Sequence, residues 1–315
     1  MAQSTQGPGD IPQIALVSAN PKTFSEEIVA RLKRRQWAVS VQTPRISEAL
    51  QALHSNQCTL LLVHDTPELP ASFILRSQIL DPLGILTPTI VVCDRAHNQE
   101  MPLLKELGMP ELIESDENPA AFVGGFEWLI RRWNQGSLRR LYQARRHYLA
   151  KEFLPFSKIM TSLKTEPELL PLVTPCMAQI LMRQTDYKAV EKLLLAALKE
   201  HPRNIGIIIN TVEFYMRAAM PETALKILSA TRKNHGNPRL LISDQIQAHL
   251  MLNELSPCIE LLEELVREDY CRRQAQDFLA RCLYAEGHLD RFRDAIQNHL
   301  LLADEFKQKW NKSAS

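Results

Sequence analysis

The chain has 315 residues, of which 45% are hydrophobic, and its 37 basic and 36 acidic side chains leave a formal net charge of +1. This length exceeds the roughly 100–200 residues of one domain, so we expect two domains, and the balanced charge excludes a strong overall field toward nucleic acid or anionic membranes. No run of about 18 apolar residues is present to span a bilayer, and the first ten residues lack the features of a secretory signal, so we expect a cytoplasmic protein without membrane insertion.

Residues 12–135 follow a disordered polar leader, residues 1–11, and alternate short apolar runs with amphipathic segments. The expected strands are 14–17, 38–41, 60–63, 89–92 and 112–113, and the expected helices include 24–32, 46–54, 103–107 and 120–133. Strands that are apolar throughout and separated by helices predict a parallel sheet with both faces covered. The pattern therefore predicts an α/β domain of the flavodoxin-like, doubly wound type.

The segment from Ile14 to Gln135 resembles the CheY-like receiver domain of bacterial response regulators in strand order, length and loop positions. In that family, acidic residues after strand one and an aspartate after strand three hold a magnesium ion, and this aspartate accepts a phosphoryl group. The corresponding positions in this chain are Ser18 and Ala19 for the acidic pair, His64 for the acceptor with Asp65 one residue out of register, Cys93 for the hydroxyl residue, and Ser115 for the lysine.

These substitutions remove the chemistry of a receiver. A hydroxyl and a methyl group offer no carboxylate to a hard cation, and phosphoryl transfer depends on positioning and on charge neutralisation by the metal and basic groups. We therefore expect a pseudo-receiver that is not phosphorylated by the usual route, with no catalytic residue, metal or cofactor. The alternative is that Asp65 remains a displaced phosphoacceptor.

From residue 136 the strand signals vanish and helical stretches recur. Small residues of successive first helices are Ala178, Val212, Ala248 and Ala280, whose numbers differ by 34, 36 and 32, and counting back 34 from Ala178 gives Ala144. Turns are expected at Thr185, Ala219, Leu255 and Gly287, and the equivalent second-helix positions are Val190, Ala224, Glu260 and Phe292. This pattern resembles the tetratricopeptide repeat (TPR), a helix-turn-helix unit of about 34 residues, over positions 136–304, before a polar tail at 305–315. Irregular helical hairpins of another type are the alternative.

The resemblance implies an α-helical superhelix whose first helices line a concave groove. Counted from the small residue, the positions one, four and five residues further on should face this groove. The expected groove residues are Arg145, Tyr148 and Leu149; Gln179, Met182 and Arg183; Glu213, Met216 and Arg217; His249, Leu252 and Asn253; and Arg281, Tyr284 and Ala285. Such a surface suits a protein or peptide partner with apolar and acidic groups. The alternative is that these residues are solvated or pack against the neighbouring domain.

The sequence thus predicts a non-catalytic bacterial signalling adaptor, in which a phosphorylation-independent receiver-like domain is coupled to a TPR scaffold. Self-association is expected through residues 103–132, the usual contact face of receivers. The alternatives are a regulator phosphorylated at Asp65, whose receiver gates the groove, and a nucleic-acid-binding regulator. The latter would use the basic junction cluster Arg131, Arg132, Arg139, Arg140, Arg145, Arg146 and His147, but a domain seam or a solvated face is the preferred reading, so nucleic acid is not the expected partner.

Overall fold

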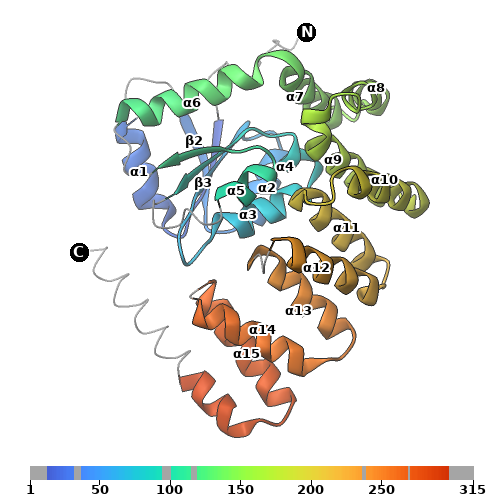
Figure 1. The fold of residues 1–315 in the computed structure, drawn as a ribbon. Helices are drawn as coiled ribbons and strands as arrows, with labels where there is room; N and C mark the ends of the chain where they lie inside the picture. Colours follow the sequence, from blue (N-terminus) through green and yellow to red (C-terminus); the bar gives the residue numbers. More distant parts are fainter. Residues whose placement is uncertain are drawn as a thin grey trace. The chain divides into compact units, whose positions relative to one another are not determined.

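The computed structural model describes residues 13–31, 37–93, 101–114, 119–235, 239–268 and 270–297. It contains one parallel sheet followed by a long series of helices, as the alternation of patterns predicts (Figure 1). The internal contacts divide the chain after Phe214 into two compact units, residues 1–214 and 215–315. The first unit therefore holds the α/β domain together with the first helices of the helical region, and its limit differs from the change of secondary-structure type near residue 135.

The sheet has the strand order β2-β1-β3-β4-β5, and all four pairings are parallel. This is the order of flavodoxin-like doubly wound domains. The strands are β1 (Gln13–Val17), β2 (Ala38–Thr43), β3 (Leu60–His64), β4 (Thr89–Cys93) and β5 (Glu111–Glu114). Each contains the strand predicted from the apolar runs. Nearly all side chains of β1, β3 and β4 are buried, as expected of strands covered on both faces, whereas those of the edge strands β2 and β5 are mostly half-buried.

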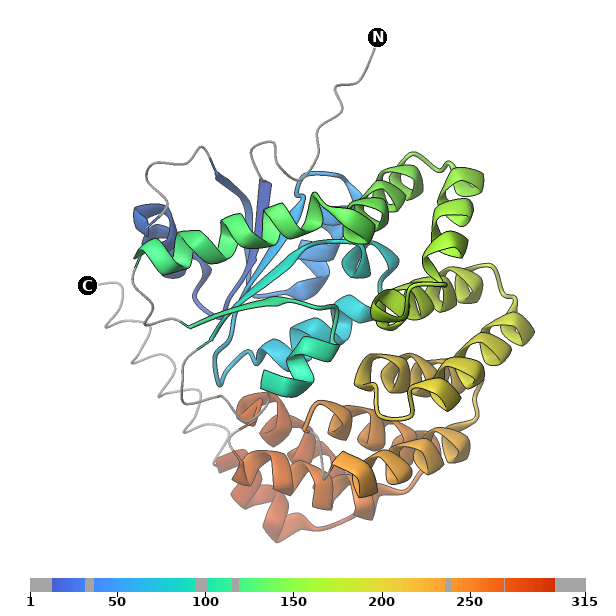
Figure 2. The same cartoon turned by 45° about the horizontal axis from the view of Figure 1, so that its top comes forward.

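Six helices in the described part of this domain cover the sheet. They are α1 (Pro21–Arg31), α2 (Ile46–His54), α3 (Ala71–Ile79), α4 (Pro82–Ile85), α5 (Met101–Glu106) and α6 (Pro119–Trp133). Helix α1 contacts α6, whereas α2 contacts α3, and α3 contacts α5, so the two groups cover opposite faces of the sheet. Figure 2 shows α6 lying along one of these faces.

Helices α3 and α4, which the sequence patterns did not predict, occupy the stretch between β3 and β4. Asp81 is the N-cap of α4, and its Oδ1 accepts hydrogen bonds from the N–H groups of Leu83 and Gly84, each at 2.9 Å. A Cβ at Gly84 would lie 2.5 Å from the carbonyl oxygen of Gln78, so only glycine fits this close approach.

The helical region consists of helix pairs. The helices are α7 (Gly136–Leu149), α8 (Phe153–Leu163), α9 (Leu170–Arg183), α10 (Tyr187–Glu200), α11 (Ile205–Arg217), α12 (Pro221–His235), α13 (Ile242–Met251), α14 (Leu255–Arg267) and α15 (Arg272–Ala285), and residues 289–297 are also helical. Within the pairs, α7 packs on α8, α9 on α10, and α13 on α14. We number the pairs one to five, from α7 and α8 to α15 and residues 289–297.

The turns within these pairs are alike. Each contains a residue with φ between 57° and 82°, and these residues follow one another at intervals of 34: Lys151, Thr185, Ala219, Asn253 and Gly287. The N–H of this residue donates to the carbonyl three residues earlier at 3.0–3.1 Å, and the next N–H donates to the carbonyl five residues earlier at 2.8–3.1 Å. This pairing is the Schellman motif of helix C-termini. The helix pairs therefore repeat with a constant period.

The constant period corrects the fourth pair of the sequence prediction. The buried residue seven positions before each turn is Ala144, Ala178, Val212, Ile246 and Ala280 in the five pairs, so Ile246 and not Ala248 is the fourth member. The turn residue is Asn253 and not Leu255, and the second-helix position belongs to the buried Cys258 and not to Glu260. The predicted intervals were unequal because this one pair was placed two positions too late in the sequence.

Replacing Thr185 with glycine is expected to raise the free energy of unfolding by about 0.5–1 kcal/mol. A β-branched side chain is strained at φ 61°, whereas glycine is not, although glycine also adds entropy to the unfolded chain. The matched change Gly287→Ala, at φ 82°, is expected to lower stability by a similar amount. Urea unfolding followed by circular dichroism measures both, and a Thr185→Gly variant less stable than the wild type would contradict the shared turn.

Candidate functional site

The receiver-like position at the carboxyl edge of the sheet is filled by side chains of the protein itself. Ser18 follows β1 and His64 ends β3, and the Ser18 hydroxyl is 3.0 Å from His64 Nδ1. The His64 ring stacks on Phe24 of α1, with centroids 3.8 Å apart and planes inclined by 3°. Ser18 Oγ also accepts a hydrogen bond from the Asn20 N–H at 3.2 Å. A hydroxyl, an imidazole and a phenyl ring thus lie where the receiver resemblance would place a carboxylate cluster, next to the half-buried Ala19.

Asp65 stabilises the turn between β3 and α3. Its side chain is 9% exposed, and its Oδ1 accepts a hydrogen bond from the Ala71 N–H at 2.7 Å, at the first residue of α3. The Asp65 N–H donates to the Val92 carbonyl at 2.8 Å. Because a buried N–H without an acceptor is costly, this carboxylate stabilises the start of α3.

Neither of the other two expected receiver positions supplies a charged side chain among the described residues. The buried Cys93 thiol donates to the Ile113 carbonyl at 3.6 Å, and Ser115 lies outside the described residues. Within the described ranges no group of three His, Cys, Asp or Glu side chains is arranged to hold a metal ion. Burial raises the pKa of the Cys58 thiol to about 12, so this cysteine is not a thiolate nucleophile at neutral pH.

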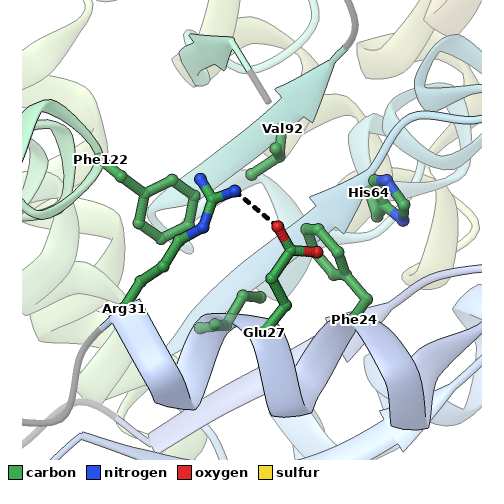
Figure 3. Close-up of a pocket in the computed structure, with 7 residues that line it drawn as sticks. Phe24, Glu27, Arg31, His64, Val92 and Phe122 are labelled. Carbon is green, nitrogen blue, oxygen red and sulfur yellow. Dashed lines mark hydrogen bonds and ion pairs between the residues drawn. The ribbon is translucent and has the colours of Figure 1, made fainter. Parts of the chain in front are cut away.

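A pocket of about 220 Å³ lies beside this edge, between α1 and α6 (Figure 3). It is lined by Phe24, Glu27, Ile28, Arg31, His64, Val92 and Phe122. The Arg31 guanidinium forms an ion pair with Glu27 at 2.5 Å and lies 5.2 Å from the centre of the Phe122 ring. Asp65 is not among the lining residues, so the pocket opens on the imidazole and not on the displaced carboxylate.

Of the expected groove residues of the first pair, Arg145 is covered by the α/β domain, whereas Tyr148 and Leu149 are half-buried. The Arg145 side chain is 2% exposed, and its guanidinium donates to the Cys58 carbonyl at 2.9 Å and to Asn56 Oδ1 at 3.4 Å. It also lies 5.7 Å from the centre of the Tyr142 ring. The expectation that Arg145 faces an open groove is therefore wrong, because the turn after α2 occupies the space in front of it.

The second pair contacts the α/β domain through a carboxylate. Arg183 of α9 donates to Asp81 Oδ2 at 2.9 Å and to the Tyr148 hydroxyl at 2.9 Å. The same Asp81 oxygen lies 2.9 Å from His54 Nε2. Burial by itself raises the pKa of Asp81, but the hydrogen bonds from His54 and Gly84 and the charges of His54 and Arg183 lower it below its ordinary value. Arg183 does pair with a carboxylate, as expected of a groove arginine, but the carboxylate belongs to the same chain.

Helix α11 adds a third set of contacts. Asn210 accepts a hydrogen bond from Gln179 of α9 at 2.8 Å and donates to the Ile79 carbonyl at 3.3 Å. Glu106 accepts the Ile205 N–H at 2.9 Å, which places a carboxylate at the positive end of this helix. Asp81, Asn210 and Glu106 were not predicted as contact residues, although the Asp81-Pro82 pair is a recognisable helix-start signal.

The remaining groove predictions divide into buried and exposed residues. Met182 and Met216 are buried, Glu213 is half-buried, and Arg217 is exposed. His249 and Asn253 are not groove positions, because Asn253 is the turn residue and His249 Nδ1 pairs with Glu254 at 2.7 Å. The corrected fourth-pair positions are Gln247, Leu250 and Met251. Arg281 and Tyr284 of the fifth pair are exposed.

Four members of the basic junction cluster have separate partners, whereas Arg131, Arg139 and Arg146 are exposed. Arg145 is buried, Arg132 lies 5.0 Å from the centre of the Trp128 ring, and Arg140 donates to Glu166 at 3.1 Å and to the Ser162 hydroxyl. His147 Nδ1 pairs with Glu152 at 2.6 Å. Arg145 thus lies at a seam between the domains, while the partners of Arg132, Arg140 and His147 belong to the same part of the chain as those residues.

Comparisons of the chain with protein-family models, with curated proteins and with solved structures found no match. None of the helices in the described part of the chain has the length and hydropathy of a membrane-spanning segment.

Replacing Asp81 with asparagine is expected to lower the stability of the first compact unit by about 1–3 kcal/mol at pH 7, because Arg183 and His54 lose a charged acceptor. Since the folded-state pKa is lowered, the carboxylate stabilises the protein above the unfolded-state pKa of about 3.9, and this contribution is lost as the pH falls through the lower folded-state pKa. The stability difference between wild type and Asp81→Asn should therefore shrink below about pH 4.

Urea unfolding of both proteins between pH 7 and pH 2.5 measures this difference. The exposed residue Asp290, which lies 3.7 Å from Arg293, provides the matched control Asp290→Asn, for which little change is expected at any of these pH values. A difference that grows on acidification would contradict the assigned role of Asp81.

Proposed function

We propose that the chain is a non-catalytic bacterial signalling adaptor of the cytoplasm. A degenerate receiver-like domain, which is not phosphorylated, is joined to a TPR-like array that binds a partner protein. The observation that carries the proposal is the filled site at the sheet edge, where His64 bonds Ser18 and stacks on Phe24. The constant period of the Schellman turns supports the TPR part of the proposal.

The α/β domain serves in this proposal as a fixed structural partner of the array. It covers the groove positions of the first pair through Arg145 and is held by the second and third pairs through Arg183 and Asn210. A partner protein therefore binds the later pairs, where Met251, Arg281 and Tyr284 are exposed. Self-association through residues 103–132 stays part of the proposal, supported by the exposed Trp128 on α6.

Phosphorylation at Asp65 is the competing function, and it is tested directly. Acetyl phosphate, or beryllofluoride with magnesium, is expected to leave the amide NMR spectrum unchanged around Asp65, because no carboxylate pair holds the metal next to it. Asp65→Ala is expected to cost about 1–3 kcal/mol by leaving the Ala71 N–H without its acceptor, whereas Asp65→Asn keeps an acceptor oxygen and should cost less. Shifts localised around Asp65 that vanish in Asp65→Asn would overturn the proposal.

Partner binding is tested by quantitative affinity capture from the native cell with the full chain as bait. A Met251→Glu variant, on the corrected groove face of α13, is expected to reduce at least one specific prey about tenfold, equivalent to about 1.4 kcal/mol. Leu289 is similarly exposed but lies on the second helix of its pair, so Leu289→Glu is the matched control and should retain the prey. A set of prey proteins that is the same for both variants would argue against a binding face on the array.

A further inference from the structure

The first and fifth helix pairs carry the same set of side chains. Arg145, Tyr148 and Phe156 of the first pair have the equivalents Arg281, Tyr284 and Phe292 in the fifth, each four periods later. The aromatic residue three positions before the arginine is Tyr142 in the first pair and Phe278 in the fifth. No other pair repeats this combination, since Gln179, Glu213 and Gln247 occupy the arginine position in the second, third and fourth pairs.

The two sets also share their geometry. The rings of Tyr148 and Phe156 have centroids 5.6 Å apart and planes inclined by 57°, and those of Tyr284 and Phe292 are 5.3 Å apart and inclined by 53°. The arginine stands six residues, and the tyrosine three residues, before a Schellman turn in both pairs. The fifth pair therefore presents its arginine and tyrosine from the same positions of the helix as the first.

In the first pair the arginine of this set binds the C-terminal end of a helix. Asn56, at φ 55°, follows α2, and the N–H groups of Asn56 and Gln57 donate to the carbonyls of Leu53 and Ala52 in another Schellman turn. Arg145 donates to the Asn56 side chain and to the Cys58 carbonyl of this turn. A guanidinium at this place also meets the negative end of the α2 dipole.

In the fifth pair the equivalent side chains are accessible. The side chain of Arg281 is 71% exposed, and its ion pair with Asp277 at 2.8 Å is a surface i,i+4 pair of the kind that contributes little. Tyr284 is 63% exposed. The arginine is thus buried and the tyrosine half-buried in the first copy of the set, whereas both are available for a ligand in the fifth.

We propose that the fifth pair binds the C-terminal turn of a helix in a partner protein, a turn that presents a side-chain amide and a backbone carbonyl oxygen. Arg281 donates to these oxygens, as Arg145 does within its own chain. The exposed Tyr284 ring packs on the apolar side of the bound turn. This inference rests on the proposed adaptor function and adds the recognition residues and the kind of structure recognised.

The probe is a fluorescein-labelled peptide of residues 46–59 of this chain, with Cys58 replaced by serine, an amidated C-terminus, and an i,i+4 staple at positions 47 and 51, which are exposed in α2. It presents the α2 turn to the full-length protein. The first pair of that protein is already occupied by the α2 turn of its own chain. Fluorescence anisotropy is expected to show saturable binding. Arg281→Met and Tyr284→Ala should each weaken binding at least tenfold, and a peptide ending at residue 55 should not bind.

Arg293 lies on the second helix of the same pair and its side chain is 79% exposed, so Arg293→Met is the matched control and should bind like the wild type. Circular dichroism checks that the variants are folded. Absence of saturable binding, equal binding by Arg281→Met and Arg293→Met, or a loss of binding only in Arg145→Met would overturn the inference. If the full chain still captures specific prey proteins in any of these cases, only the inference about the fifth pair fails and the adaptor function stands. If the full chain captures no specific prey, the adaptor function itself fails.

Discussion

The buried guanidinium of Arg145 is the contact on which the arrangement of the first compact unit depends. A cation removed from water is costly unless it is well solvated by the protein, and burial accordingly lowers the pKa of this group. Its solvation comes from the Cys58 carbonyl, the Asn56 side chain and the Tyr142 ring, while its Nε has no hydrogen-bond partner among the described residues. Because two of these three groups belong to the α/β domain, α7 is stable in this position only when that domain is docked on it.

The same constraint divides the helical array into two parts with different uses. Arg183 and Asn210 bind Asp81 and the Ile79 carbonyl, so the second and third pairs hold the segment that connects α3 to α4. Close approach is part of this docking, since a Cβ at Gly206 would lie 2.6 Å from the Ile79 side chain and 3.1 Å from the Glu106 carbonyl. The α/β domain thus binds Arg145 and Arg183, two of the residues expected to face a groove. On the proposed function, a receiver-like domain without its active site is retained because the array needs it as a structural ligand.

Much of the fold follows from local sequence patterns, whereas the occupants of the groove do not. The apolar runs predict all five strands, and in β1, β3 and β4 they follow from burial on both faces, which requires apolar side chains at successive positions. In the fourth helix pair the choice of Ala248 over Ile246 moved the register by two positions, and the turn residue Asn253 would have corrected it, since asparagine tolerates positive φ. Helical periodicity identifies the face of α7 that carries Arg145, but it says nothing of what covers that face. That information lies in the turn after α2, about 90 residues away in the sequence.

Helix α3 connects the loop after β3 to the helical array. Its first N–H is held by Asp65, and its last carbonyl, that of Ile79, accepts a hydrogen bond from Asn210 of α11. A helix of nine residues that is fixed at both ends transmits a displacement only if it moves as a body. Such a movement would also have to break the contact between Arg183 and Asp81, two residues beyond the end of α3. The Asp65 carboxylate is therefore positioned to resist movement, because it fixes one end of the helix to which the helical pairs are anchored at the other.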